Sequence, residues 1–572
     1  MIGRPPLFHA ARRSGAETDP ALDTGRTRLL FTAAMFACAF AVIALRLVDV
    51  TLLKEGNDPR LAQSRSPTVL QTGRADIVDR NGVLLATSLK TASLYASPHL
   101  VIDAREAAAK LVHVLPELNQ AQVYERLTSD RKFVWLYRHL TPHQQYEVNR
   151  LGIPGLDFLT EERRVYPAGS LAAHLLGFTD VDNRGLAGIE REFDEPLRSR
   201  DTPFRLSLDV RVQHAMREEL SHAMHLFRAV GAAGLVQDVR TGEILAMVSL
   251  PDFDPNLPNT IDPETRFNRT TLGVYEMGST FKIFTAAMAL DAGKVTMQSG
   301  YDATHPIHIA RFTIHDDHAK RRWLSLPEII MYSSNIGAAK MALDVGPAGQ
   351  RAFLGKVGML RPASLELPEI GAPLVPARWR EINTMTIAFG HGIAVSPVQL
   401  VNGIAAMANG GVLHPPTLLK RDDTAVAPGT RVISPRTSEE IRRLMRLVVE
   451  QGTGKNAEAP GYLVGGKTGT AEKVLGKRYK AKALMSSFVG VFPMNAPRYV
   501  VYAMLDEPSG TKQTYGYATG GWVAAPVVRN VVLRIAPILG IHPVDEESPE
   551  IRQQLAIDIV SKDMGKRRLA SF

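Results

Sequence analysis

The chain has 572 residues, of which 45% are hydrophobic and 22% are charged, and this length is enough for two or three globular domains. Its 67 Lys and Arg residues outnumber its 58 Asp and Glu residues, and a basic surface of this kind suits anionic lipid or anionic cell-wall polymer, but the charge alone favours a solvated surface without a specific partner. Nucleic acid is not expected, because the basic residues are scattered and not interleaved with aromatic ones. The single cysteine, Cys38, excludes an intrachain disulfide and a cysteine-rich metal site.

The first predicted elements are a cytoplasmic tail over residues 1–28 and a membrane anchor over residues 29–53. Leu29 to Leu45 is an uncharged apolar run, and with the residues that follow it the stretch reaches the roughly 20 residues that a spanning helix needs. Arginines precede the run, which places the N-terminus in the cytoplasm and all later residues outside: Arg4, Arg12, Arg13, Arg26 and Arg28.

A cleaved signal peptide is the alternative to an anchor. Ala39-Phe40-Ala41 has the small residues of a cleavage site, but it lies inside the apolar run and not after it. We therefore favour an uncleaved single span. Arg46 and Asp49 interrupt its outer end, where the membrane interface or a partner helix would accommodate them.

A mixed α/β module is predicted over residues 66–205. It begins with a strand, an Asn81-Gly82 turn and a second strand, between Gly73 and Ala86. Two or three amphipathic helices are expected between residues 104 and 150.

A larger α+β domain is predicted over residues 206–545, followed by a C-terminal tail, 546–572. Asp209 is placed to cap a helix that begins at Val210. Two hairpins are predicted, and with the strand around Lys467 they form an antiparallel sheet with helices inserted in mid-chain: 234–248 and 487–505.

Ser279 and Lys282 form an S-x-x-K motif. Residues three apart share one face of a helix, and Gly278 with the apolar run after Lys282 predicts a buried helix with the serine in its first turn. A serine hydroxyl is a weak nucleophile until a base takes its proton. Lys282 would act as that base if burial and a second cation, for which Lys467 is the candidate, lower its pKa. The backbone N–H groups of Ser279 and Thr470 are expected to bind the developing oxyanion.

Two further motifs follow in the order that a penicillin-recognising serine acyltransferase requires: Ser333-Ser334-Asn335 and Lys467-Thr468-Gly469. Ser333 is expected to relay a proton to the leaving amine, and Asn335 to hold the substrate amide. Lys467 and Thr468 are expected to bind a substrate carboxylate, and Gly469 to let a substrate backbone approach.

Two other polar segments have a less specific pattern. His315-Asp316-Asp317-His318 contains residue types that ligate metals, but we interpret it as a polar loop, and we expect no metal and no cofactor. His391 resembles a catalytic base in residue type only, and we interpret it as structural.

The chain resembles the class B penicillin-binding proteins, and most closely the division-specific septal peptidoglycan transpeptidases of the FtsI type. Beyond the three motifs, the resemblance covers nearly everything after Leu29 and includes these segments: Arg74 with Asp79-Arg80-Asn81-Gly82, Thr241 to Met247, Tyr275-Glu276, Phe389 to Gly392, Gly452-Thr453-Gly454 and Asp506-Glu507-Pro508. It departs at Met277, where similar proteins carry Pro, and at Ala75, where they carry Gly.

The resemblance implies a single-pass inner-membrane protein with a pedestal module and a periplasmic penicillin-binding domain. The implied activity is that of a serine D-Ala-D-Ala transpeptidase, which cross-links peptidoglycan stem peptides at the division septum and is acylated by β-lactams. It further implies a polytopic glycan polymerase and other division proteins as partners.

Three alternatives remain open. The first is an elongation-specific transpeptidase, which the sequence separates from a septal one only by family resemblance. A penicillin-binding sensor or division scaffold would be acylated without turnover. A secreted β-lactamase is disfavoured by the anchor, the chain length and the large N-terminal module.

Overall fold

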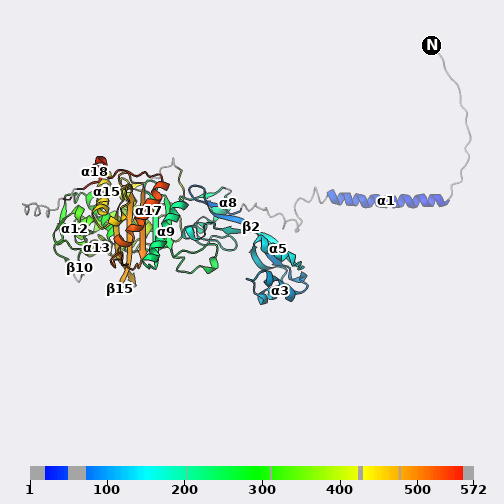
Figure 1. The fold of residues 1–572 in the computed structure, drawn as a ribbon. Coiled ribbons are helices and arrows are strands. Elements are labelled where there is room, and N and C mark those ends of the chain that lie inside the picture. Colours follow the sequence, from blue (N-terminus) through cyan, green and yellow to red (C-terminus); the bar gives the residue numbers. More distant parts are fainter. Residues whose placement is uncertain are drawn as a thin grey trace, which may run out of the picture. The chain divides into compact units, whose positions relative to one another are not determined.

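The computed structural model describes residues 20–48, 73–200, 202–309, 312–422, 429–475, 478–557 and 559. The chain divides into two compact units, Met1–Gln71 and Thr72–Phe572. Figure 1 shows the elements of both, coloured from blue at the N-terminus to red at the C-terminus. Parts of the predicted tail, anchor and C-terminal segment lie outside the described residues, including Arg4, Arg12, Arg13 and Asp49.

The first unit contains one helix, α1 (Pro20–Val48), among its described residues. Its apolar stretch Leu30–Leu45 is exposed along its whole length. This apolar stretch is shorter than a membrane span requires. Within the described part of the chain, Gly520–Ile538 is the helical stretch that has the length and composition of a span. Half of that stretch is buried in the second unit, as in the core helix of a globular domain. The N-terminal span therefore remains a prediction.

The second unit begins with a five-stranded sheet that we call, with its helices, the pedestal. Its strand order is β3-β2-β1-β5, and β4 also pairs with β2. The strands are β1 (Ile77–Val78), β2 (Leu84–Ala96), β3 (Val134–Leu140), β4 (Leu156–Val165) and β5 (Phe204–Arg205). The helices are α3 (Ala104–Val114), α4 (Gln120–Leu127), α5 (Pro142–Arg150), α6 (Ala173–Leu176), α7 (Gly188–Glu192) and α8 (Asp194–Ser199).

The sequence predicts part of this pedestal correctly. The strand, Asn-Gly turn and strand over 73–86 are β1 and the start of β2, and three helices do lie between residues 104 and 150. The prediction missed β3, whose residues alternate between buried and half-buried positions as it pairs with β2. Ala75, where relatives carry Gly, does not have a positive φ, so the backbone there does not require glycine.

The second part of this unit, from α9 to α18, is built on an antiparallel sheet with the order β14-β15-β16-β6-β7. Its strands are β6 (Gly231–Asp238), β7 (Ile244–Leu250), β14 (Gly465–Leu475), β15 (Arg478–Phe492) and β16 (Tyr499–Asp506). Both predicted hairpins are present, as β6–β7 and β15–β16. β14 carries the K-T-G residues at one end of the order, so its outer edge has no neighbouring strand within the described sheet.

Helices cover both faces of this sheet. Side chains of β16 alternate between two cores, with Val501 and Ala503 facing α9 and α17, and Val500 and Met504 facing the helices of the other face. α17 and α9 lie side by side over the sheet in Figure 1. The helices are α9 (Val210–Leu226), α10 (Phe281–Asp291), α11 (Leu326–Met331), α12 (Asn335–Lys356), α13 (Glu381–Ile387), α14 (Pro397–Ala408), α15 (Pro435–Glu450), α16 (Gly520–Val523), α17 (Ala525–Ile538) and α18 (Pro549–Leu555).

Short strands pair between these helices, outside the central sheet. They are β8 (Gly300–Asp302) with β11 (Trp323–Ser325), β9 (Ile307–Ile309) with β10 (Phe312–Ile314), and β12 (Val412–Leu413) with β13 (Thr430–Arg431). The first two pairs lie between α10 and α11, and they place the loop around Asp316 next to the start of α12.

A buried ionic cluster holds the pedestal together. Glu190 is fully buried and accepts hydrogen bonds from Arg74 Nε at 2.5 Å and from Arg164 Nε at 2.7 Å. Arg74 also reaches Asp194 at 2.7 Å. These residues come from four separate segments, so the cluster fixes the β1, β4, α7 and α8 regions against one another.

Glu190→Gln keeps the size of the side chain but removes the carboxylate that pairs with both Arg74 and Arg164, both of which are buried. Breaking one partner out of a buried ion pair typically costs about 3–5 kcal/mol, so we expect the local free energy of unfolding to fall by about 3 kcal/mol. Amide hydrogen exchange of β2 and β4 measures this change. Glu147→Gln, which removes an exposed partner of Arg150, is the matched control and should change stability by less than about 0.5 kcal/mol. Equal effects of the two substitutions would contradict a structural role for the cluster.

Candidate active site

Ser279 lies in a 3₁₀ turn, Gly278–Thr280, that leads directly into α10. Gly278 has φ +54°, which favours glycine, and its N–H donates to the carbonyl of Gly390 at 3.3 Å. A Cβ on Gly390 would lie 2.1 Å from the carbonyl oxygen of Gly278, so the two glycines allow these backbones to touch. Thr280 Oγ1 donates to the carbonyl of Met277 at 2.9 Å and closes the turn.

Lys282 is fully buried, and its amine lies among the first two motifs. Nζ is 2.9 Å from Ser279 Oγ, 3.0 Å from Ser333 Oγ, 2.7 Å from the Ser333 carbonyl oxygen and 2.7 Å from Asn335 Oδ1. The structure therefore brings together the serine and lysine of S-x-x-K and both polar residues of S-x-N, as the sequence predicts.

These contacts set the direction of proton transfer at Lys282. The Ser333 carbonyl and Asn335 Oδ1 can only accept hydrogen bonds, so they occupy the two N–H groups of a neutral amine. The lone pair is then available to the hydroxyl of Ser279. Asn335 Nδ2 donates to the carbonyl of His315 at 3.0 Å, which fixes the amide with its oxygen toward Lys282. Asn335 thus orients the base, and its predicted contact with a substrate amide stays a prediction.

Ser333 lies between the two lysines. Its Oγ is 3.0 Å from Lys282 Nζ and 3.0 Å from Lys467 Nζ. Its backbone has φ +61°, an uncommon value for a residue other than glycine. Ser334 beside it caps α12 by accepting from the N–H of Gly337. This cap and the strained φ aim the Ser333 hydroxyl at both amines, where it can pass a proton between them.

Lys467 is also fully buried, on β14. Its Nζ contacts Thr468 Oγ1 at 3.1 Å, and this hydroxyl lies 3.0 Å from Thr453 Oγ1. Thr453 belongs to the Gly452-Thr453-Gly454 segment, to which sequence reasoning gave no role. Its only signal in the sequence was the family resemblance.

Burial lowers the pKa of both lysines, because desolvation disfavours the charged amine. The pKa of Lys282 falls from 10.5 to about 7, although Asp316 and Asp317 oppose the fall. The pKa of Lys467 falls well below its usual value through burial first and the nearby Lys282 second. Burial is therefore the first cause for both lysines, as the sequence predicted for Lys282, and repulsion between the two amines contributes to the fall at Lys467.

Gly469 packs against the turn that carries Ser279. A Cβ at this position would lie 2.5 Å from Ser487 Oγ and 2.8 Å from the carbonyl oxygen of Met277. The absent side chain therefore makes room for this turn, and the predicted approach of a substrate backbone stays a prediction. Thr470 lies one residue further along β14, and its Oγ1 accepts from the N–H of Gly520 at 3.1 Å.

The His315–His318 segment supports α12. Asp316 accepts hydrogen bonds from Ser334 Oγ at 2.8 Å and from the N–H of Ile336 at 3.0 Å, so it caps the helix that follows Ser333. Among the described residues, no three His, Cys, Asp or Glu side chains lie close enough to share a metal ion.

His391 follows Gly390, whose backbone contacts the serine turn at Gly278. Its Nδ1 is 3.5 Å from Glu276 Oε2, and the other oxygen of Glu276 accepts from the N–H of Gly392 at 2.8 Å. The side chain of His391 is 32% exposed, in contrast to the fully buried lysines.

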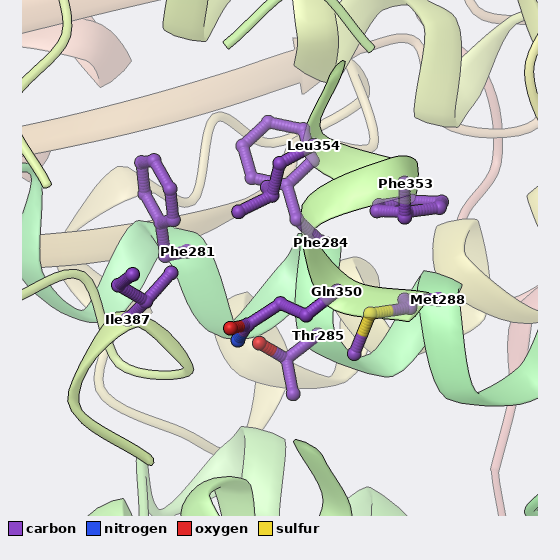
Figure 2. Close-up of a pocket in the computed structure, with 8 residues that line it drawn as sticks. All are labelled: Phe281, Phe284, Thr285, Met288, Gln350, Phe353, Leu354 and Ile387. Carbon is purple, nitrogen blue, oxygen red and sulfur yellow. The ribbon is translucent and has the colours of Figure 1, made fainter. Parts of the chain in front are cut away.

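A cavity of about 10 Å³ lies beside α10, which is about the room that one water molecule needs. Figure 2 shows the side chains that line it, from α10, α12 and α13: Phe281, Phe284, Thr285, Met288, Gln350, Phe353, Leu354 and Ile387. None of the serines, lysines or other polar residues of the three motifs lines it, so it is a packing gap behind the helix of Lys282 and not the substrate site.

The comparisons with known proteins agree with this geometry. The family described as the penicillin-binding protein transpeptidase domain matches residues 232–533. The penicillin-binding protein dimerisation domain matches residues 69–211. The chain belongs to the penicillin-binding proteins. Its fold is accordingly the transpeptidase fold of that family, with the dimerisation domain as its pedestal.

Relatives match over almost the whole chain. The probable peptidoglycan D,D-transpeptidase FtsI of Caulobacter vibrioides is 41% identical, over 94% of this penicillin-binding protein and 92% of the relative. Peptidoglycan D,D-transpeptidase FtsI of Escherichia coli K12 is 29% identical over 91% and 92%. The solved transpeptidase domain of penicillin-binding protein 3 from Burkholderia pseudomallei is 34% identical, with a TM-score of 0.54, and covers 59% of this chain and 98% of its own.

The lowered pKa of Lys282 predicts how acylation depends on pH. Only the neutral amine can take the proton of Ser279, and a pKa of about 7 leaves about one tenth of it neutral at pH 6 and about nine tenths at pH 8. We expect the acylation rate by a penicillin without groups that titrate in this range to rise about tenfold per pH unit below about pH 7 and to level off above it.

Stopped-flow fluorescence of the full chain in detergent measures this profile. Lys294→Ala, which removes an exposed lysine just after α10, is the control and should keep the same midpoint. A rate that does not change between about pH 5.5 and pH 8.5 would exclude Lys282 as the group whose ionisation limits acylation.

Proposed function

We propose that this penicillin-binding protein is a peptidoglycan D,D-transpeptidase that cross-links stem peptides through an acyl-enzyme on Ser279. One observation carries the proposal: a single buried amine, that of Lys282, contacts the hydroxyls of both Ser279 and Ser333. A serine hydroxyl next to a neutral amine and a second hydroxyl is the set of groups that acyl transfer needs.

Acylation uses each motif residue in turn. Lys282 takes the proton of Ser279 as Oγ attacks the carbonyl of the D-Ala-D-Ala donor. The backbone N–H groups of Ser279 and Thr470 bind the oxyanion, and Ser333 passes the proton to the departing D-Ala amine. Lys467 and Thr468, at the outer edge of the sheet, bind the terminal carboxylate of the donor.

Turnover distinguishes this function from that of a sensor or scaffold, which would stop at the acyl-enzyme. The favoured role is septal, since relatives named FtsI match along most of their length. An elongation-specific role is the alternative within the same chemistry. Stage V sporulation protein D of Bacillus subtilis is also similar, at 32% identity over 91% of the chain, and its name refers to sporulation and not to division.

The proposed location is the inner membrane, with the N-terminus in the cytoplasm and the second unit in the periplasm. The proposal rests on the apolar stretch of α1 and on the arginines that precede it. The proposed partners of the protein at the septum are a polytopic glycan polymerase and other division proteins. They would contact the membrane helix and the pedestal and leave the active site free.

Ser279→Ala removes the proposed nucleophile. We expect it to abolish covalent labelling by a fluorescent penicillin and the transfer of a stem-peptide donor to an amine acceptor, because no acyl-enzyme can form. Gel fluorescence and mass spectrometry of the full chain measure the two reactions. Ser199→Ala, which removes an exposed hydroxyl at the end of α8, is the control and should still be labelled. Labelling of Ser279→Ala at the wild-type rate would overturn the assignment. A wild-type chain that is labelled but never transfers a donor would favour the sensor.

Replacing residues 29–53 with an unrelated Leu-rich span tests the proposed role of the anchor. We expect penicillin acylation in detergent to be unchanged, because the site lies wholly in the second unit. In cells, the swapped chain should lose septal localisation or division activity, as seen with a fluorescent fusion. Full complementation by the swapped chain would mean that the helix is only a tether.

A further inference from the structure

The structure places a second ionisable residue, His391, in the segment whose backbone contacts the turn that carries Ser279. Gly390, which precedes His391, is in backbone contact with Gly278, which precedes Ser279. Glu276 anchors the segment that contains His391, because its carboxylate accepts a hydrogen bond from the N–H of Gly392 at 2.8 Å. The backbone that carries His391 is therefore held against the serine turn, and the imidazole lies beside Glu276 and is partly open to solvent.

Charged groups from four elements face this imidazole. Glu276 precedes the serine turn, Lys282 lies on α10, Asp317 lies in the loop before β11, and Glu472 lies on β14. Burial lowers the pKa of His391 and Lys282 lowers it further, while the three carboxylates oppose the fall. The imidazole is thus neutral at pH 7. The Glu276 carboxylate beside Nδ1 favours the tautomer with its proton on Nδ1, which leaves Nε2 as an acceptor.

The proposed transpeptidation, on which this inference rests, needs such an acceptor in its second half. The amine that attacks the acyl-enzyme arrives as an ammonium with three N–H bonds, and the amide product retains one. Of the two protons that leave, one returns to Ser279 Oγ through Lys282 when the ester bond breaks. Lys282 cannot also take the other proton, because its amine must be neutral to accept the proton that it passes to Ser279 Oγ.

We propose that His391, held by Glu276, is the base that removes the first proton from the acceptor ammonium. Nε2 takes that proton, and the freed lone pair of the amine attacks the acyl carbonyl carbon. The C–N bond forms, the C–Oγ bond of the ester breaks, and the second amine proton passes through Lys282 to Ser279 Oγ. His391 then releases its proton to solvent. His391 would therefore be a catalytic residue of the transfer step, and not the structural residue that the sequence predicted.

This role separates two reactions that can be measured on the same full chain. Acylation by a penicillin needs no acceptor, so H391Q should acylate within about twofold of wild type. Transfer of a thioester stem-peptide donor to a stem-peptide amine should fall by about 10²-fold at pH 7, the usual scale for loss of a general base. The residual rate should rise about tenfold per pH unit toward the pKa of the acceptor itself, unlike the wild-type profile.

Hydroxylamine provides the decisive comparison, because its nitrogen is already neutral at pH 7 and needs no base. H391Q should transfer the donor to hydroxylamine at nearly the wild-type rate, a selectivity that a merely structural defect would not produce. E276Q is the second variant, with His391 still present, and should give the same pattern with a smaller loss. H214Q, which alters an exposed histidine on α9, should behave as wild type with both acceptors.

The outcomes are distinguishable. If H391Q and E276Q use the stem-peptide amine at the wild-type rate and pH profile, the inference is wrong while the proposed function stands. If E276Q loses the transfer rate equally with the stem-peptide amine and with hydroxylamine, the inference about His391 is also wrong. If the wild-type chain transfers its donor to neither acceptor, the proposed function itself fails.

Discussion

The shared burial of two lysine amines is the constraint on which the active site depends. Lys282 and Lys467 are both fully buried, and the hydroxyl of Ser333 lies 3.0 Å from each. Two ammonium groups in so small a volume without a paired anion would repel each other and lose their hydration. The site is therefore stable only when at least one of the two amines is neutral. That constraint keeps a neutral base next to Ser279 near pH 7.

The second requirement is close packing of three backbone segments around the nucleophile. Gly278 and Gly390 touch through their main chains, and Gly469 leaves room for the carbonyl of Met277. Met277 replaces the usual proline, with φ −86°. Its sulfur accepts a hydrogen bond from the buried hydroxyl of Tyr502 at 3.7 Å. Side-chain contacts beneath the turn thus help to hold a backbone that a proline ring would otherwise restrain.

The sequence predicted what local chemistry determines and missed what depends on long-range packing. The three motifs, the cap at Asp209 and both hairpins follow from short spacings, and the structure contains them. β3 was missed because a strand is stabilised by its neighbour, here β2, and not by its own residues. The orientation of Asn335 depends on His315, 20 residues away, and the effect of Lys282 on Lys467 depends on how deeply both are buried.

Charges of both signs surround the nucleophile. Lys467 lies at the proposed site of the donor carboxylate, whereas the carboxylates of Glu276, Asp317 and Glu472 act on His391 together with Lys282. In the proposed reaction, this field orients a donor that ends in a carboxylate and an acceptor that arrives as a cation. A penicillin carries the carboxylate but brings no acceptor amine, so it uses only the first half of the site. Once the acyl-enzyme has formed, completion of the cycle depends on groups that the inhibitor never engages.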